Sequence, residues 1–212
     1  MNRQVGIHIA MPTRRPSSPP RRRATSRPAA GARERLLVAA DALFYQRGIR
    51  SVGIDEIIAA AGVAKASLYH HFGSKDELIA EYVRRRGDEW WTWFRESVES
   101  RASSPAARLL AVFDVLAEWV AAPTFRGCAL QNAAIELADA SHGAHRVVVT
   151  GKRGVRSYLA DLAAQARLRD PNAVAQQLAL LFEGAIVTAL LEGSVAPALN
   201  ARAAATLLLR AK

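Results

Sequence analysis

Residues 63–75, with the sequence VAKASLYHHFGSK, bring two lysines, two histidines, a tyrosine and two serines into about four helical turns. Such residue types can form a metal or catalytic site, or a surface that meets a negatively charged partner. His70 and His71 are adjacent, and neighbouring side chains on a helix point about 100° apart, so the two are poorly placed to share a metal ion. We therefore interpret the stretch as a surface for an anionic partner.

A second group has residue types and a three-residue spacing that would suit zinc or a similar ion on one helical face: Glu136, Asp139, His142 and His145. Ser141 and Gly143 are expected to break the helix at this point. We therefore favour polar residues at an exposed helix junction, and we expect no metal site.

Cys128 is the one cysteine of the chain, so no disulfide can form within it. Arg126 lies two residues earlier, and its charge would make the thiol more reactive if the two side chains approached. We favour a small buried cysteine and keep a thiol-based redox or electrophile sensor as the alternative. The sequence has no nucleophile elbow, Walker loop, zinc-protease motif or dinucleotide fingerprint, so we expect neither an enzyme nor a cofactor.

The composition favours a nucleic-acid partner. The 212 residues are 50% apolar, enough for a core, and carry a formal charge of +10. This charge favours an anionic partner, with nucleic acid first and an acidic membrane surface second. The longest apolar run, residues 178–191, contains Glu183 and Gly184 and is shorter than the roughly 20 residues of a membrane span. We expect a buried helix, no export signal and a cytoplasmic protein.

Residues 1–30 differ in composition from the rest, with seven arginines, five prolines and no acidic residue. Such a segment buries too little apolar surface to fold, so we expect a disordered arm. Its charge of +7 leaves +3 of the total of +10 for residues 31–212. The arm is either a solvated tail, with Met11 as a possible initiator, or a segment that follows DNA phosphates and loses affinity with salt.

From Arg33 onward the apolar residues follow a helical period, so we expect an all-α protein. Residues 31–76 are expected to form a three-helix domain with a helix-turn-helix, and residues 77–212 a helical ligand-binding and dimerisation domain. The expected helices cover 33–47, 54–61, 65–71, 75–97, 105–120, 127–140, 143–168, 171–192 and 197–210. Gly48 after the first and Ser104-Pro105 before the fifth are typical boundary signals.

The opening stretch lies in the second of two short helices, 54–61 and 65–71, joined by a turn that contains Gly62. This pattern is typical of a helix-turn-helix. Leu68 and Phe72 are four residues apart and are expected to point inward, so Lys65 and Tyr69 point outward. Lysine attracts phosphate, and hydroxyl and imidazole groups can bind phosphate oxygens or base edges. The expected target of this face is the major groove.

Residues 33–78 resemble the DNA-binding domain of the TetR family of transcriptional regulators, through ALFYQRG, GIDEIIAAAGV and above all LYHHFGSKDEL. The later segment FRGCALQNAAIELAD is also similar to segments seen in that family. The resemblance implies that Lys65 and Ala66 approach base edges, and it assigns a second set to the DNA backbone: Ser67, Tyr69, His70, His71 and Lys75. The sequence departs from the family before both short helices, where hydroxyl residues are often found: Val52 and Gly53 precede the first of them, and Ala64 precedes the second.

The second half of the chain is expected to enclose an apolar cavity for a partly hydrophobic ligand, such as an aromatic one. Trp90 and Phe94 share a helical stripe with Ile79 and Val83, and we favour core for that stripe. The candidate ligand-binding residues are the aromatic and polar side chains on nearby segments: Tyr82, Trp93, Phe113, Trp119, Cys128, Gln131 and Asn132.

The helix expected at 171–192 is apolar nearly all round, so it must be covered on every side. We expect a symmetric partner to cover one side in a four-helix interface with the helix ending near Leu168, and full burial within one chain is the alternative. Together with this expected dimer, the resemblance to the TetR family implies a homodimeric repressor, released from a roughly palindromic operator by a small molecule. The alternatives are an architectural DNA binder, a sensor acting through Cys128, and a ligand-binding or enzymatic protein with a vestigial helix-turn-helix.

Overall fold

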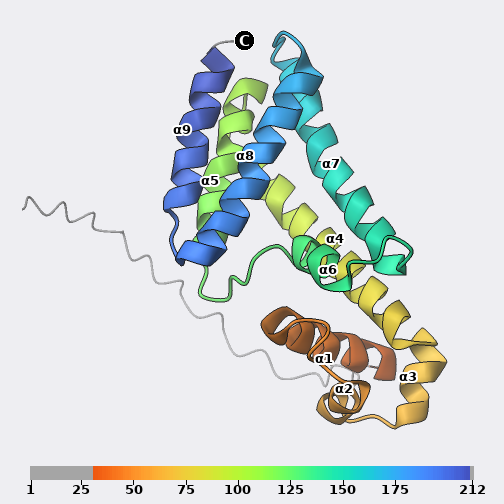
Figure 1. Cartoon of the computed structure of the whole chain (residues 1–212). Coiled ribbons are helices and arrows are strands. Elements are labelled where there is room, and N and C mark those ends of the chain that lie inside the picture. The colour runs from red at the N-terminus through yellow and green to blue at the C-terminus, as the bar shows by residue number, and fades with distance from the viewer. Residues whose placement is uncertain (1–30, 211–212) are drawn as a thin grey trace, which may run out of the picture. The chain divides into compact units, whose positions relative to one another are not determined.

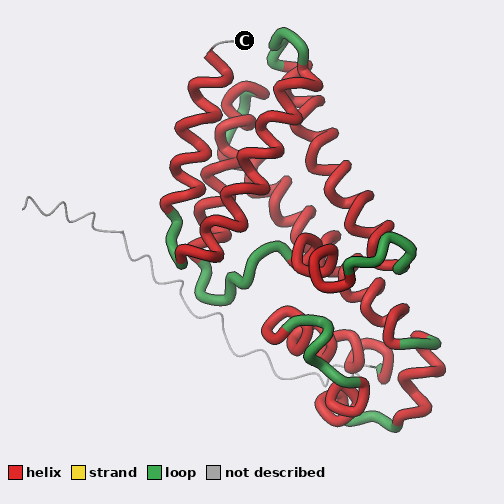
Figure 2. The backbone as a smooth tube through the Cα atoms, viewed as in Figure 1, coloured by secondary structure: helices red, strands yellow, loops and turns green. Residues whose placement is uncertain are grey.

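The computed structural model describes residues 31–210, which form nine helices and no strand (Figures 1 and 2). In chain order these are α1 (Ala32–Arg47), α2 (Ile54–Ala61), α3 (Lys65–Phe72), α4 (Lys75–Arg101), α5 (Pro105–Ala121), α6 (Ala129–Leu137), α7 (Gly143–Gln165), α8 (Pro171–Glu192) and α9 (Ala196–Arg210). The predicted all-α fold is confirmed. The expected disordered arm, residues 1–30, lies outside the described residues.

Three helices have boundaries that differ from the expected ones by more than one residue, and in two of these helices the difference has a local cause. The sixth helix begins at Ala129 rather than residue 127 because Gly127 has φ of 82°, outside the helical region. It ends at Leu137, where Ala138 adopts a left-handed conformation. The seventh helix stops at Gln165, just before Arg167 with φ of 57°. The fourth helix continues to Arg101 rather than residue 97.

Two hydrophobic clusters form the interior, and α4 belongs to both. In its first half, Tyr82 and Val83 pack in a cluster with α1, α2 and α3, together with parts of α6 and α7. In its second half, Phe94 packs in a cluster with α5, α7, α8 and α9 that also contains Phe113 and Phe182. The 27 residues of α4 span about 40 Å, so one rigid element connects the two halves.

The eighth helix lies between α7 and α9, and its buried face includes Leu178, Phe182 and Ile186 (Figure 1). Its opposite face leaves Leu180 74% and Leu191 79% exposed. This helix has the length and the mean hydropathy, 1.7, of a membrane span, but a single such helix is weak support for one.

The expected pairing of α8 with α7 across a dimer interface stays a prediction, and the exposed apolar side chains favour α9 in the place of α7. None of the large exposed apolar side chains of the described residues lies on α7, whereas α9 carries Leu199 and Leu207. The buried side of α7, including Val155 and Leu159, is already used within the chain. The unpaired apolar surface is therefore shared by α8 and α9.

Candidate DNA-reading helix and ligand cavity

The turn between α2 and α3 has the geometry that a helix-turn-helix requires. Gly62 adopts a left-handed conformation with φ 62° and ψ 44°, which glycine reaches without steric cost. Gly53 and Ala64 are the residues that precede α2 and α3, and neither helix has a side-chain cap. The two departures noted in the sequence are therefore confirmed as uncapped helix starts. Their free backbone N–H groups remain donors for an anion such as phosphate.

The third helix has one buried and one open side. Leu68 is fully buried and Phe72 is 4% exposed, whereas Tyr69 is 45% exposed. Other predicted DNA-contacting residues of this helix also lie at the surface: Lys65, Ala66, His70 and His71 exposed, and Ser67 half-buried. The inward and outward positions predicted from the helical period are confirmed. Whether these side chains contact DNA stays a prediction.

Two lysines of this surface have partners within the chain. Lys65 Nζ lies 3.1 Å from Asp55 Oδ1, and this hydrogen bond raises the pKa of Lys65. The ammonium therefore stays charged at neutral pH. Lys75 Nζ donates to Ile49 O at 3.2 Å and lies 6.0 Å from the Phe44 ring centroid. Lys75 thus ties the start of α4 to the segment after α1, in addition to its predicted role at the DNA backbone.

The possible zinc residues occupy a helix junction. His142 Nδ1 accepts the Ala144 N–H and caps α7, while Glu136 Oε2 accepts the Arg50 N–H. Asp139 accepts two hydrogen bonds from Ser141, which lower its pKa. Within residues 31–210, no three His, Cys, Asp or Glu side chains are grouped to hold a metal ion.

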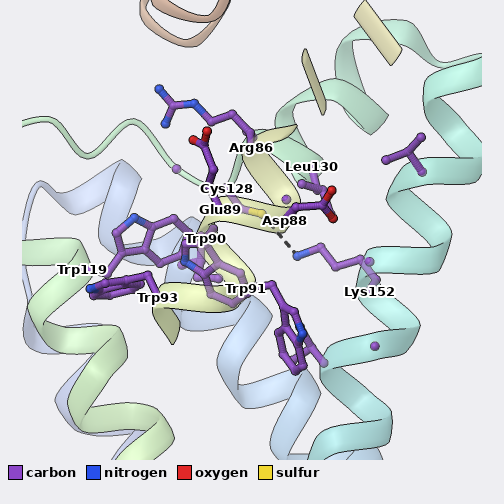
Figure 3. A pocket seen from close by; sticks show the side chains of 18 of the residues that line it. Arg86, Asp88, Glu89, Trp90, Trp91, Trp93, Trp119, Cys128, Leu130 and Lys152 are labelled. Atoms are coloured by element: carbon purple, nitrogen blue, oxygen red, sulfur yellow. Dashed lines mark hydrogen bonds between the residues drawn. The ribbon is translucent and has the colours of Figure 1, made fainter. Parts of the chain in front are cut away.

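A cavity of about 920 Å³ lies among α4, α5, α6, α7 and α8 (Figure 3). All four tryptophans of the chain contribute to its wall: Trp90, Trp91, Trp93 and Trp119. The Trp90 ring stacks on Phe94 with centroids 4.7 Å apart and lies 5.3 Å from Trp119. The predicted apolar cavity beside Trp93 is thus present, and its size suits a drug-sized molecule.

The structure separates the candidate ligand-binding residues into three groups. Trp93, Trp119 and Cys128 line the cavity. Gln131 and Asn132 lie behind the wall, where Gln131 Nε2 donates to Glu183 and Asn132 Nδ2 donates to Arg126 O.

Tyr82 and Phe113 require a correction, because both are buried in packed clusters and neither lines the cavity. Tyr82 shares the α4 face of Trp93 but lies eleven residues earlier, about 16 Å along the axis, against Phe44 of α1. Its burial raises its pKa.

One half-buried polar cluster on the cavity wall was missed by sequence reasoning. Lys152 Nζ lies 3.4 Å from Cys128 Sγ (Figure 3). It also lies 2.5 Å from Glu183 Oε2, and Gln131 Nε2 donates to the same Glu183 oxygen at 2.5 Å. The signal was available, because Glu183 is a carboxylate inside an otherwise apolar run and therefore needs a partner.

Tyr45 and Arg86 connect the cavity wall to α1. The Tyr45 hydroxyl accepts the Arg126 N–H and donates to Gly127 O, each at 3.0 Å. The Arg86 guanidinium lies 3.7 Å from the Tyr45 ring centroid and binds both carboxylate oxygens of Asp41 at 2.7 and 3.1 Å. Burial is the main reason that the pKa of Tyr45 is raised. Since Tyr45 and Arg86 both line the cavity, part of its wall belongs to the link with α1.

Comparisons with protein families match both halves of the chain. Residues 36–82 match the model "Bacterial regulatory proteins, tetR family", and residues 105–205 match "Tetracyclin repressor-like, C-terminal domain". A crystal structure of a TetR-family transcriptional regulator from Streptomyces coelicolor is 33% identical, with a TM-score of 0.75. The match covers 84% of this chain and 94% of that one.

Two curated repressors are also similar. The HTH-type transcriptional repressor KstR2 of Mycobacterium tuberculosis is 40% identical over 81 residues, which are 38% of this chain and 40% of that protein. The match therefore spans only two fifths of that relative. The HTH-type transcriptional repressor NemR of Escherichia coli is 28% identical over 81% of this chain and 90% of its own length. The crystal structure of its reduced form has a TM-score of 0.72, at 27% identity over 82% of this chain and 95% of that one.

Proposed function

We propose, since this chain belongs to the TetR family of bacterial transcriptional regulators, that it is a homodimeric repressor whose DNA affinity is controlled by a small molecule. It binds a roughly palindromic operator and releases it when a partly hydrophobic ligand occupies the cavity. The observation that carries this proposal is that Tyr45 and Arg86 belong both to the cavity wall and to the link with α1.

The DNA side of the proposal is supported by the exposed face of α3. Lys65 and Ala66 read base edges, and Tyr69, His70 and His71, with Ser67 and Lys75, hold the backbone. Two copies related by a twofold axis bind successive major grooves when their α3 helices lie about 34 Å apart. The apolar surface shared by α8 and α9 supports this pairing, because water-exposed leucines there become buried between two chains.

The ligand side of the proposal follows from differential affinity. A ligand that packs best against shifted positions of Tyr45 and Arg86 favours a different position of α1 and α4. This different position changes the spacing of the two α3 helices. DNA and ligand then weaken each other's binding by one reciprocal factor. The protein acts in the cytoplasm, where its operator is, and α8 serves the dimer rather than a membrane.

The proposal is tested with an electrophoretic mobility shift on the DNA upstream of the protein's own gene. The wild type is expected to give a specific shift, and Lys65→Ala to weaken it by about tenfold to a hundredfold, the effect of one lost base contact. Arg153→Ala is the control, because it removes an equally exposed charge from α7. Absence of any specific shift by the wild type favours a vestigial helix-turn-helix.

Deletion of residues 1–30 separates the repressor from an architectural DNA binder. The repressor keeps its preference for the operator, because its base contacts come from α3. An architectural binder that depends on the arginine-rich arm loses most of its affinity and shows no operator preference.

A second candidate function, thiol sensing, is favoured by the position of Cys128 on the cavity wall, 3.4 Å from Lys152 Nζ. A small electrophile inside the cavity can reach the thiol. If this is the trigger, N-ethylmaleimide releases the operator from the wild type and Cys128→Ser abolishes that response. Equal responses of the two proteins exclude Cys128 as the trigger.

A further inference from the structure

The ion pair between Lys152 and Glu183 is half-buried, whereas most other charged side chains of the cavity wall are exposed. The two side chains come from α7 and α8 and are 26% and 28% exposed, so both are largely withdrawn from water. Arg86, the other half-buried cation of the wall, is already bound by both oxygens of Asp41. The charges of Lys152 and Glu183 cancel, and Gln131 adds a neutral donor.

The pair keeps unused hydrogen-bonding capacity. An ammonium has three N–H donors, and Lys152 uses two, toward Glu183 Oε2 and Cys128 Sγ. Both side-chain donors to Glu183, Lys152 and Gln131, bind the same oxygen, Oε2. Among residues 31–210, no hydrogen bond reaches Oε1. One donor of Lys152 and one acceptor of Glu183 therefore remain without a partner within residues 31–210.

We propose that this pair makes the cavity selective for an uncharged aromatic ligand whose polar end both donates and accepts a hydrogen bond, as a primary carboxamide does. The inference rests on the proposed function, in which the cavity is the effector site. An amide satisfies Nζ and Oε1 together at a small desolvation cost. A carboxylate ligand loses its hydration and is repelled by the Glu183 carboxylate, and an ammonium ligand is repelled by Lys152. Each charged ligand therefore gains little binding free energy.

The aromatic part of the ligand follows from the rest of the wall. Trp90, Trp91, Trp93 and Trp119 offer flat, polarisable surfaces, and aromatic pairs stabilise each other beyond simple burial. Trp90 already packs against Phe94 and Phe182, which fixes the ring that faces a ligand.

Three probes that share one ring system test the inference: biphenyl-4-carboxamide, biphenyl-4-carboxylate and biphenyl-4-ylmethylammonium. Binding to the full-length protein is followed by quenching of tryptophan fluorescence, since every tryptophan lines the cavity. The wild type is expected to bind the carboxamide about tenfold more tightly than either charged probe, the ratio given by one satisfied polar contact of roughly 1.4 kcal/mol.

Two variants are expected to change the order of the probes in opposite directions. Glu183→Gln leaves the Lys152 charge unpaired, so the carboxylate becomes the tightest probe. Lys152→Gln leaves the Glu183 charge unpaired, so the ammonium becomes the tightest. Arg153→Gln is the control, because it removes a neighbouring charge of α7 that does not line the cavity, and the order should stay that of the wild type. Circular dichroism confirms that each variant is folded.

Any one of three results overturns the inference: equal affinities of the wild type for the three probes, no quenching by any of them, or an order of affinities that neither variant changes. These measurements contain no DNA, so they separate it from the proposed function. A protein that ranks the probes as expected but shifts no operator is a binding protein with the proposed ligand class. A protein that shifts its operator but ranks the probes equally keeps the proposed function and loses the ligand class.

Discussion

At the scale of single residues, Tyr45 shows how one hydroxyl can join two parts of the chain. Its oxygen binds the backbone of Arg126 and Gly127, eighty-odd positions away, while its ring lies under Arg86. Gly127 is buried, so its carbonyl has no direct access to water when the hydroxyl is removed. The hydroxyl therefore stabilises the start of α6 from the end of α1.

Tyr45→Phe is expected to lower the free energy of unfolding by about 1 to 2 kcal/mol, because the ring stays and two backbone groups lose their partner. The measurement is urea denaturation followed by circular dichroism. Tyr69→Phe is the matched control: its side chain is exposed, so stability should stay within about 0.5 kcal/mol of the wild type while operator affinity falls. A Tyr45→Phe protein as stable as the wild type contradicts the link described above.

At the scale of helices, the two glycines of α7 have opposite surroundings. A Cβ on Gly151 would lie 2.6 Å from Leu130 Cδ2, whereas a Cβ on Gly154 would meet no atom within 4 Å. The other methyl group of the same Leu130 side chain lies 3.3 Å from the position that a Cβ on Gly87 of α4 would take. Gly151 and Gly87 therefore permit α6 to lie close to both long helices.

Gly154→Ala is expected to raise the free energy of unfolding by about 0.5 to 1 kcal/mol, because alanine has the higher helix propensity. Gly151→Ala gains the same propensity but must displace Leu130, so it is expected to be less stable than the wild type. Chemical denaturation of the two variants side by side measures the difference. Equal stabilisation by both substitutions contradicts the close approach of α6 to α7.

The sequence alone was sufficient to predict those elements that are determined by a local pattern of residues. The period of Leu68 and Phe72, with the glycine turn before them, determined α3 and its outward face correctly. The cavity was anticipated from the tryptophans, but its polar cluster was not, because Lys152 and Glu183 meet only through the packing of α7 on α8. Tyr82 was assigned to the cavity for the same reason, since the helical period gives the direction in which a side chain points but not the element against which it packs.

At the scale of the whole molecule, one buried and two half-buried tyrosines make stability sensitive to alkaline pH. Burial raises the pKa of Tyr45, Tyr82 and Tyr158 above the ordinary value of 10.0. Above that value the unfolded chain releases phenolic protons that the folded chain retains, so this contribution to stability is complete below pH 10.0 and is lost as the pH rises toward the folded-state values.

Thermal melting between pH 8 and pH 11 is therefore expected to show a fall in Tm that begins near the ordinary tyrosine pKa of 10.0. Tyr82→Phe removes one of the three groups and should make the fall shallower, although the variant starts from a different Tm. Because every other titrating group is retained, the difference in slope belongs to Tyr82. Parallel curves for the two proteins contradict the assigned direction.

The proposed recognition of an operator depends on the proposed dimerisation, and the surface of α8 and α9 gives a direct test of it. Leu180, Val187 and Leu191 recur at seven and four residues along α8, so they form one stripe, beside Leu199 and Leu207 of α9. Leu180→Glu places a charge in the centre of the proposed interface, where it would be desolvated without a partner.

We expect the Leu180→Glu protein to elute with the 22.9 kDa mass of one chain in light-scattering chromatography, and the wild type with twice that mass. Circular dichroism should be unchanged, because Leu180 is 74% exposed within one chain. Operator affinity should fall steeply, since each half-site is then bound independently. Ile135→Glu is the matched control, with the same 74% exposure but a position on α6, and it should remain a dimer. If the Leu180→Glu protein remains a dimer, or if Ile135→Glu dissociates instead, the interface does not lie on α8. The spacing of the two α3 helices must then also differ from the one proposed.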